Sequence, residues 1–197
     1  MRKMICNSLL KISLISTFLF IVGCSGPQVK YGDAKAVETL TVDYGSTDLQ
    51  SIAESMVRSL LQTKVISGSK YAPTITVADV KNKTTEYIDT RVITDKIRTQ
   101  LLKSGQVRFA VNINEMQSQV DELKRQNQSG LYKSNTISKT GNMEGAKYRL
   151  EGSISSIVKQ TKDVKDVYYV FNLNLIDNET GLLEWADEKE IRKSATR

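Results

Sequence analysis

The chain has 197 residues, of which 40% are hydrophobic and 25% charged, and its 28 Lys and Arg against 22 Asp and Glu give a formal net charge of +6. It contains no histidine, which excludes Ser-His-Asp and Cys-His catalysis in their usual forms and every His-ligated metal site. No recognisable Ser-Lys or paired-carboxylate motif takes their place. We therefore expect a binding protein without catalytic residues or a metal site.

Residues 1–23 have the layout of a secretory signal peptide, with a basic start and then an apolar run over 12–22. The run is about 11 residues long, whereas a membrane-spanning helix needs roughly 20. Removing this segment takes three basic residues with it and lowers the net charge to +3. Such a charge is ordinary for a protein surface and argues against nucleic acid as a partner.

The run ends in Ile21-Val22-Gly23-Cys24, which resembles the bacterial lipoprotein box, in which the cysteine is acylated and becomes the first mature residue. The other cysteine, Cys6, leaves with the signal peptide, so the mature chain has one cysteine and no intrachain disulfide. We expect a covalent lipid on Cys24 and no other cofactor. The alternative is a cysteine that happens to lie near an ordinary cleavage site.

Residues 24–46 are expected to form the lipidated N-terminus and a short tether, because they lack clear periodicity and contain Pro27 and three glycines. Residues 25–46 would reach roughly 75 Å when fully extended and about 25 Å as a flexible coil. Three apolar side chains in this stretch are candidates for docking on the domain: Val37, Leu40 and Val42.

The globular domain is expected over 47–197, beginning with an amphipathic helix. Thr47 as N-cap and Gln50 three residues later fit a capping box. Apolar residues then recur every three or four positions, which predicts one buried helix face: Leu49, Ile52, Ala53, Met56, Val57, Leu60 and Leu61.

A strand over 74–80, a connection over 81–86 and a second helix follow. Asp89 or Thr90 would cap this helix, whose buried stripe is Ile93, Ile97 and Leu101 and whose end is marked by Gly105. A short strand over 107–111 precedes a third helix that opens at Asn112. The side chains expected to face inward from that helix are Ile113, Met116, Val120 and Leu123.

The remaining part begins with a polar loop over 126–142 and a short fourth helix over 142–146, and then changes to a period of two. Alternation predicts strands from Tyr148, over 169–175 and from Leu183, the last two joined by a turn over 177–181. The fold class predicted is α/β, a single domain with a mixed β-sheet flanked by helices.

The order and spacing of four segments resemble the LpoB family: the helix over 49–61, the strand and turn over 74–84, the helix ending at Gly105, and the hairpin ending Gly181-Leu182-Leu183-Glu184-Trp185. The resemblance implies a fold similar to the N-terminal domain of TolB. It also implies a non-enzymatic outer-membrane lipoprotein, facing the periplasm, that activates a bifunctional penicillin-binding protein in peptidoglycan synthesis. Ser25, where an Asp often marks inner-membrane retention, agrees with the outer membrane. Better-known members carry a long proline-rich segment after the lipid, which this chain lacks.

The connection after the first strand is the predicted partner-binding surface, because Asn82, Lys83 and Thr84 match the Asn-basic-Thr pattern of the family. Tyr87 adds an apolar ring with a polar tip and Arg91 adds a charge, a mixture favoured at interfaces. The segment 81–108 carries seven basic and three acidic residues, which suits an acidic partner. Alternatively, Asn82 and Thr84 satisfy local backbone groups in a turn.

Two other functions stay open at this point. The curli-secretion lipoprotein CsgG has a similar periplasmic domain, so an envelope secretion or assembly role is the second hypothesis, although CsgG also supplies membrane strands that need about ten alternating residues. An envelope hydrolase is the third. The sequence leaves the oligomeric state open.

Overall fold

The computed structural model describes residues 29–38, 41–112 and 115–196. It separates a unit that ends at Ala34 from a compact unit that runs from Lys35 to Arg197, and the fold below is that of the second unit. The predicted signal peptide and Cys24 lie outside the described residues, as does Leu40. Among the described residues, no helix combines the length and the apolar character that crossing a membrane requires.

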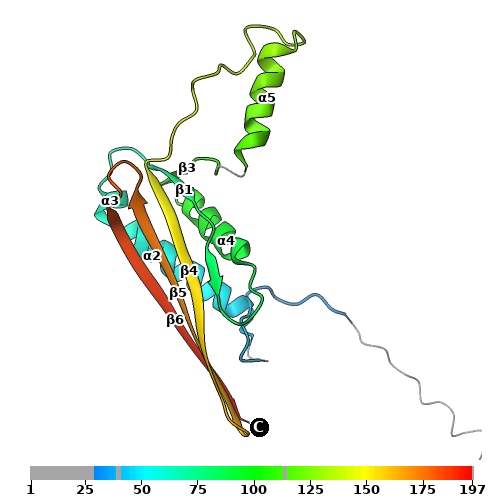
Figure 1. The fold of residues 1–197 in the computed structure, drawn as a ribbon, viewed down its shortest axis with the longest axis vertical. Coiled ribbons are helices and arrows are strands. Elements are labelled where there is room, and N and C mark those ends of the chain that lie inside the picture. Colours follow the sequence, from blue (N-terminus) through cyan, green and yellow to red (C-terminus); the bar gives the residue numbers. More distant parts are fainter. Residues whose placement is uncertain (1–28, 39–40, 113–114, 197) are drawn as a thin grey trace, which may run out of the picture. The chain divides into compact units, whose positions relative to one another are not determined.

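A mixed six-stranded sheet forms the centre of the unit, which confirms the predicted fold class. The strand order is β3-β1-β4-β5-β6, with β2 pairing beside β1 along the same edge of β4. β1 and β2 run parallel to β4, and the three long strands β4, β5 and β6 form antiparallel pairs (Figure 1). The strands are β1 (Thr74–Val77), β2 (Lys81–Lys83), β3 (Arg108–Phe109), β4 (Tyr148–Gln160), β5 (Val164–Asp177) and β6 (Leu183–Thr196).

The sheet has one covered and one uncovered face. Odd-numbered β5 residues from Val167 to Leu175 are buried, whereas the even-numbered residues between them are half-buried. Trp185 lies on the odd side and donates through Nε1 to Oγ of Ser59 at 3.2 Å, which fixes helix α2 (Ser46–Gln62) on that side. We call the opposite side, which carries the even-numbered residues of β5, the open face.

Helix α2 confirms the first predicted helix, and its stripe from Ile52 to Leu60 is buried. The predicted capping box is wrong. The helix begins two residues earlier with Gly45 as N-cap, and the Asp48 carboxylate accepts the Gly45 N–H at 2.8 Å. The hydroxyl of Thr47 instead accepts the backbone N–H of Glu38 at 2.7 Å, which ties the preceding segment to the helix.

The first predicted strand stops at Val77, and part of the predicted connection is itself the strand β2. Val77 pairs with Leu150 and Lys81 with Ser153, so three residues on one strand oppose two on β4. This one-residue excess is a bulge, which separates β1 from β2. Between these pairs lies Gly152, where a β-carbon would collide with the carbonyl oxygen of Asn172.

Helix α4 (Thr90–Lys103) forms as predicted. Oδ1 of Asp89 accepts the Arg91 N–H at 3.0 Å as the cap, and Gly105 follows the helix with a φ of +69°, a conformation that favours glycine. Its residues Ile93, Ile97 and Leu101 are buried. α2 and α4 pack together behind the long strands (Figure 1).

Two predictions in the next segment are wrong. The third helix, α5 (Met116–Gln128), has no buried residue, so its apolar stripe does not enter the core; Ile113 lies outside the described residues. The predicted helix over 142–146 has no regular secondary structure, and Oε1 of Glu144 in this segment accepts the Thr74 hydroxyl at 2.6 Å. The polar loop begins at 129, because α5 continues to Gln128.

The C-terminal turn is confirmed. Oδ1 of Asp177 accepts the N–H groups of Glu179 and Thr180 at 2.8 and 3.0 Å, and Gly181 has a φ of +72°. Of the three N-terminal side chains that are candidates for docking on the domain, Val42 is buried and Val37 is 75% exposed.

Candidate functional site

The connection between β2 and α4 is built on the side chain of Asn82. Its Oδ1 accepts the backbone N–H and the hydroxyl of Thr84 at 2.9 and 2.8 Å, and its Nδ2 donates to the carbonyl of Glu86 at 2.9 Å. These hydrogen bonds agree with the alternative interpretation, in which Asn82 and Thr84 satisfy local backbone groups in a turn. They make the loop a defined shape rather than leaving the Asn82 amide free for a partner.

Four of the five residues of the predicted surface are exposed, and only Thr84 is half-buried: the exposed ones are Asn82, Lys83, Tyr87 and Arg91. Lys83 pairs with Ser155 of β4, which places its side chain on the open face. Tyr87 is 95% exposed, at a point where the loop is already fixed by Ile88, which is buried. An exposed aromatic ring on a fixed loop loses little conformational freedom on binding, as contact residues at interfaces do.

Arg91, in the first turn of α4, lines a cavity of about 370 Å³ beside the end of β1. Its neighbours in this cavity carry charges of both signs: Asp79, Asp95, Arg98 and Glu115. Arg98 pairs with Asp95 at 2.8 Å. Of the five predicted contact residues, only Arg91 is among the described residues that line this cavity. The structure thus brings Asn82 and Thr84 together by hydrogen bonds and places Lys83 and Arg91 on different surfaces.

Glu86 fixes this loop to two other parts of the fold, a role that the sequence does not indicate. One carboxylate oxygen accepts the Tyr44 N–H at 2.9 Å, and the other accepts the Tyr169 hydroxyl, which also lies 3.2 Å from the carbonyl of Val42. Burial of the hydroxyl and the bond to Glu86 raise the pKa of Tyr169. The loop, the segment before α2 and the centre of β5 are therefore one connected network.

A larger cavity, of about 710 Å³, lies at the β1–β3 edge of the sheet and also escaped the sequence-based reasoning. Arg108 and Glu144 form an ion pair at its rim. The hydrogen bond from Thr74, and secondarily Arg108, lowers the pKa of Glu144. The apolar side chains that line it come from three separate segments: Phe109, Val111, Met116 and Met143. No single stretch of sequence contains enough of this set to mark it.

A scan against protein-family models matches residues 48–191 to the family described as the peptidoglycan-synthase activator LpoB. The chain belongs to this family. The match begins within α2 and ends within β6, so it includes strands β1 to β5, the first part of β6 and the β2–α4 connection. LpoB family members are activators rather than enzymes, in agreement with the expectation of a binding protein.

Solved LpoB structures are among the matches. The LpoB C-terminal domain from Escherichia coli is 19% identical, with a TM-score of 0.45, and the alignment covers 74% of this chain and 99% of that one. The domain from Salmonella enterica gives 17% identity, a TM-score of 0.44 and the same coverage. Lipoprotein GNA1162 from Neisseria meningitidis is 10% identical, with a TM-score of 0.40, over 62% of this chain and 84% of its own. A search of curated proteins found no match.

Proposed function

We propose that this LpoB family member is a lipid-anchored periplasmic protein that binds and activates a bifunctional penicillin-binding protein. The family match over 48–191 carries the proposal. The lipoprotein-box sequence ending at Cys24 supports an anchor in the outer membrane, with the domain facing the periplasm. The exposed Tyr87 on a hydrogen-bonded loop, together with the exposed Lys83 at the end of β2, supports the β2–α4 connection as the contact surface.

The direct test measures the cognate synthase in vitro, with and without the mature chain carrying Cys24→Ser. We expect the chain to increase both glycan polymerisation and peptide cross-linking. A chain that neither binds the synthase nor changes either rate would refute the proposal.

The contact surface is tested separately with Lys83→Glu and Tyr87→Ala, each expected to weaken synthase binding at least about tenfold. Lys70→Glu is the matched control, because Lys70 is exposed and precedes the opposite end of β1 from the loop. Equal binding by all three variants would move the surface elsewhere and leave the activator role standing.

A further inference from the structure

The exposed Tyr87 stands between two residues that anchor its backbone. Ile88 is buried and Glu86 is half-buried, whereas the ring of Tyr87 faces solvent. We call residues 84–88 the contact loop. Among the side-chain hydrogen bonds of the contact loop to described residues, only those of the Glu86 carboxylate reach beyond residues 82–88. The position of Tyr87 therefore depends on what this carboxylate holds.

The Glu86 carboxylate holds the chain directly before α2, which we call the junction (residues 41–45). One oxygen accepts the Tyr44 N–H at 2.9 Å. The other accepts the hydroxyl of Tyr169, which lies 3.2 Å from the carbonyl oxygen of Val42. The junction and the contact loop thus lie side by side, although Tyr44 and Glu86 are 42 positions apart in the sequence (Figure 1).

The junction is also held on the sheet. Nζ of Lys165 lies 2.9 Å from the Asp43 carboxylate, and Nζ of Lys193 donates to the Asp43 carbonyl at 2.7 Å. Val42 is buried in the core. Exposed hydrogen bonds join Glu38 to the start of α2, so the junction leaves its place only when these open as well. The junction therefore has a seat between the sheet and the contact loop.

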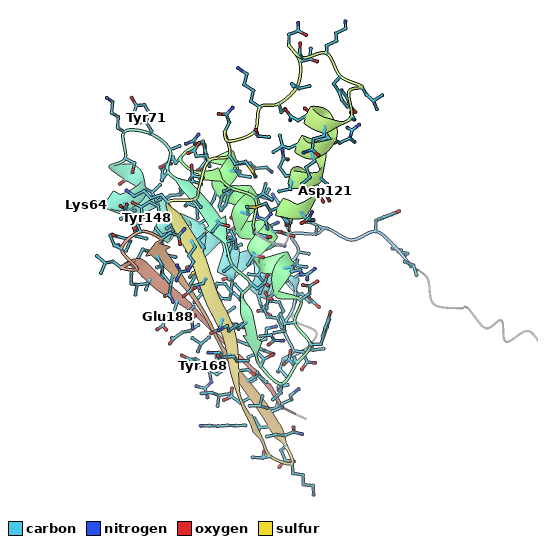
Figure 2. All side chains as sticks on the ribbon, turned by 45° about the horizontal axis from the view of Figure 1, so that its top comes forward. Lys64, Tyr71, Asp121, Tyr148, Tyr168 and Glu188 are labelled. Atoms are coloured by element: carbon cyan, nitrogen blue, oxygen red, sulfur yellow. The ribbon has the colours of Figure 1, made fainter. Side chains whose placement is uncertain are left out.

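Tyr169 is the point at which the junction, the contact loop and the sheet meet. Its side chain is 1% exposed on the covered side of β5, whereas Tyr168, which Figure 2 labels, has its side chain on the open face. The Tyr169 ring packs edge-on against the Tyr44 ring, with centroids 6.1 Å apart. Burial and the bond to Glu86 raise the pKa of Tyr169, so its hydroxyl keeps its proton and donates at neutral pH.

We propose that the junction controls the contact loop: in its seat it holds Tyr87 in the position that binds the synthase, and out of its seat it frees the loop. Glu86 is the positioning residue that couples the two segments. A loop fixed in its binding position binds more tightly than a free one, because less conformational freedom is lost. The inference rests on the proposed function, which supplies the synthase as the ligand. Since the junction lies between Cys24 and α2 in the chain, a pull on the proposed lipid would reach the contact surface by this route.

The coupling acts in both directions. The factor by which the seated junction increases the affinity for the synthase equals the factor by which the bound synthase stabilises the seat. The backbone N–H of Tyr44 reports on the seat, because it donates to Glu86 and lies outside the predicted contact surface. Bound synthase should therefore slow the exchange of this amide hydrogen with solvent.

The first test needs no synthase and measures amide hydrogen exchange in the mature chain carrying Cys24→Ser. Tyr169→Phe removes the hydroxyl between Glu86 and Val42 and keeps the buried ring. We expect amides of the contact loop and the junction to exchange at least about fivefold faster, and those of α4 to keep the wild-type rate. Tyr44→Phe is the matched control, because the Tyr44 hydroxyl is buried and has no hydrogen-bond partner among the described residues.

A second variant disturbs the junction alone and is measured at the contact loop. Val42→Asp places a carboxylate at a buried position of the junction and changes no residue of the loop. We expect the same acceleration at the contact-loop amides, with α4 still protected. Glu86→Gln keeps an acceptor for the Tyr44 N–H and an amide for the Tyr169 hydroxyl, so it should keep the wild-type rates that Glu86→Ala loses.

The synthase arm uses the same variants. Tyr169→Phe and Val42→Asp should weaken synthase binding at least about fivefold, whereas Tyr44→Phe should bind as wild type does. Contact-loop amides that keep the wild-type rate in Val42→Asp, in a chain whose α4 amides stay protected, would overturn the coupling. If Val42→Asp does not fold, equal rates in the two phenylalanine variants would overturn it.

Faster exchange at the contact loop with unchanged synthase binding would overturn the control of binding. A wild-type chain that does not bind the synthase would refute the proposed function, whereas the exchange rates, which need no synthase, decide the coupling separately.

Discussion

Asp48 connects three parts of the fold through one carboxylate. Its side chain is 5% exposed, accepts the Gly45 N–H, and pairs with Nζ of Lys193 on β6 at 2.5 Å. Lys193 also donates to the carbonyl of Asp43 at 2.7 Å. The start of α2, the segment before it and the edge strand are thereby joined in one small region.

Asp48→Ala removes the bond at the helix start and leaves the ammonium of Lys193 without its carboxylate. We expect the free energy of unfolding to fall by about 3 kcal/mol, measured by urea denaturation. Asp95→Ala is the control, because it breaks an exposed pair with Arg98 and should cost less than about 1 kcal/mol. Equal losses in the two variants would contradict this account.

Asp177 gives the stability of the fold an acid-sensitive component. Hydrogen bonds from the backbone N–H groups of Thr180 and Glu179 hold its pKa below the ordinary value of 3.8. The unfolded chain therefore binds the proton more readily, and the stabilisation present above pH 3.8 is lost as the pH falls below it. We expect Asp177→Asn to flatten the loss of stability between about pH 5 and pH 2. Acid-unfolding curves of variant and wild type that run parallel would contradict this.

At the scale of the elements, the close approach of two strands at Gly152 is the sharpest constraint. A β-carbon there meets backbone of β5 rather than a movable side chain. We expect Gly152→Ala to cost about 2–4 kcal/mol or to prevent folding, as measured by thermal unfolding. Gly145→Ala, where a β-carbon would meet nothing within 4 Å, should leave the melting temperature unchanged.

Helix α5 stands at the other extreme, because it contributes no buried residue. Replacing 115–141 with a short Gly/Ser linker should change the free energy of unfolding by less than about 1 kcal/mol. Leu60→Ala, which truncates a fully buried side chain in α2, should cost about 2–5 kcal/mol in the same denaturation assay. A deletion as costly as Leu60→Ala would show that α5 supports the core.

The elements that could be predicted from the sequence are those whose pattern is local. The stripes of α2 and α4, the Asp89 cap and the Asp177–Gly181 turn each depend on residues within a few positions of one another. β2 escaped prediction because three residues with a central asparagine become a strand only by pairing with 153–155, which lie 72 positions away. The apolar stripe of α5 predicts an amphipathic helix, and the helix forms, but periodicity does not say whether another part of the fold covers that stripe.

At the scale of the whole molecule, the candidate site also combines features that depend on local sequence with features that depend on residues far apart in the chain. The Asn82-Lys83-Thr84 segment is predicted from its match to the Asn-basic-Thr pattern of the family, and its internal hydrogen bonds are local. Glu86 was missed because its partners, Tyr44 and Tyr169, lie 42 and 83 positions away.

The hydrogen bonds between Glu38 and the start of α2 shorten the segment that separates the domain from Cys24. The backbone N–H of Glu38 donates to Thr47, and its carboxylate accepts the Ser46 N–H at 3.1 Å. If Cys24 carries the proposed lipid, the 13 residues from 25 to 37 connect it to the domain and span at most about 45 Å. The domain would then stay within that distance of its own membrane. A synthase anchored in the opposite membrane would have to extend across most of the periplasm to meet it.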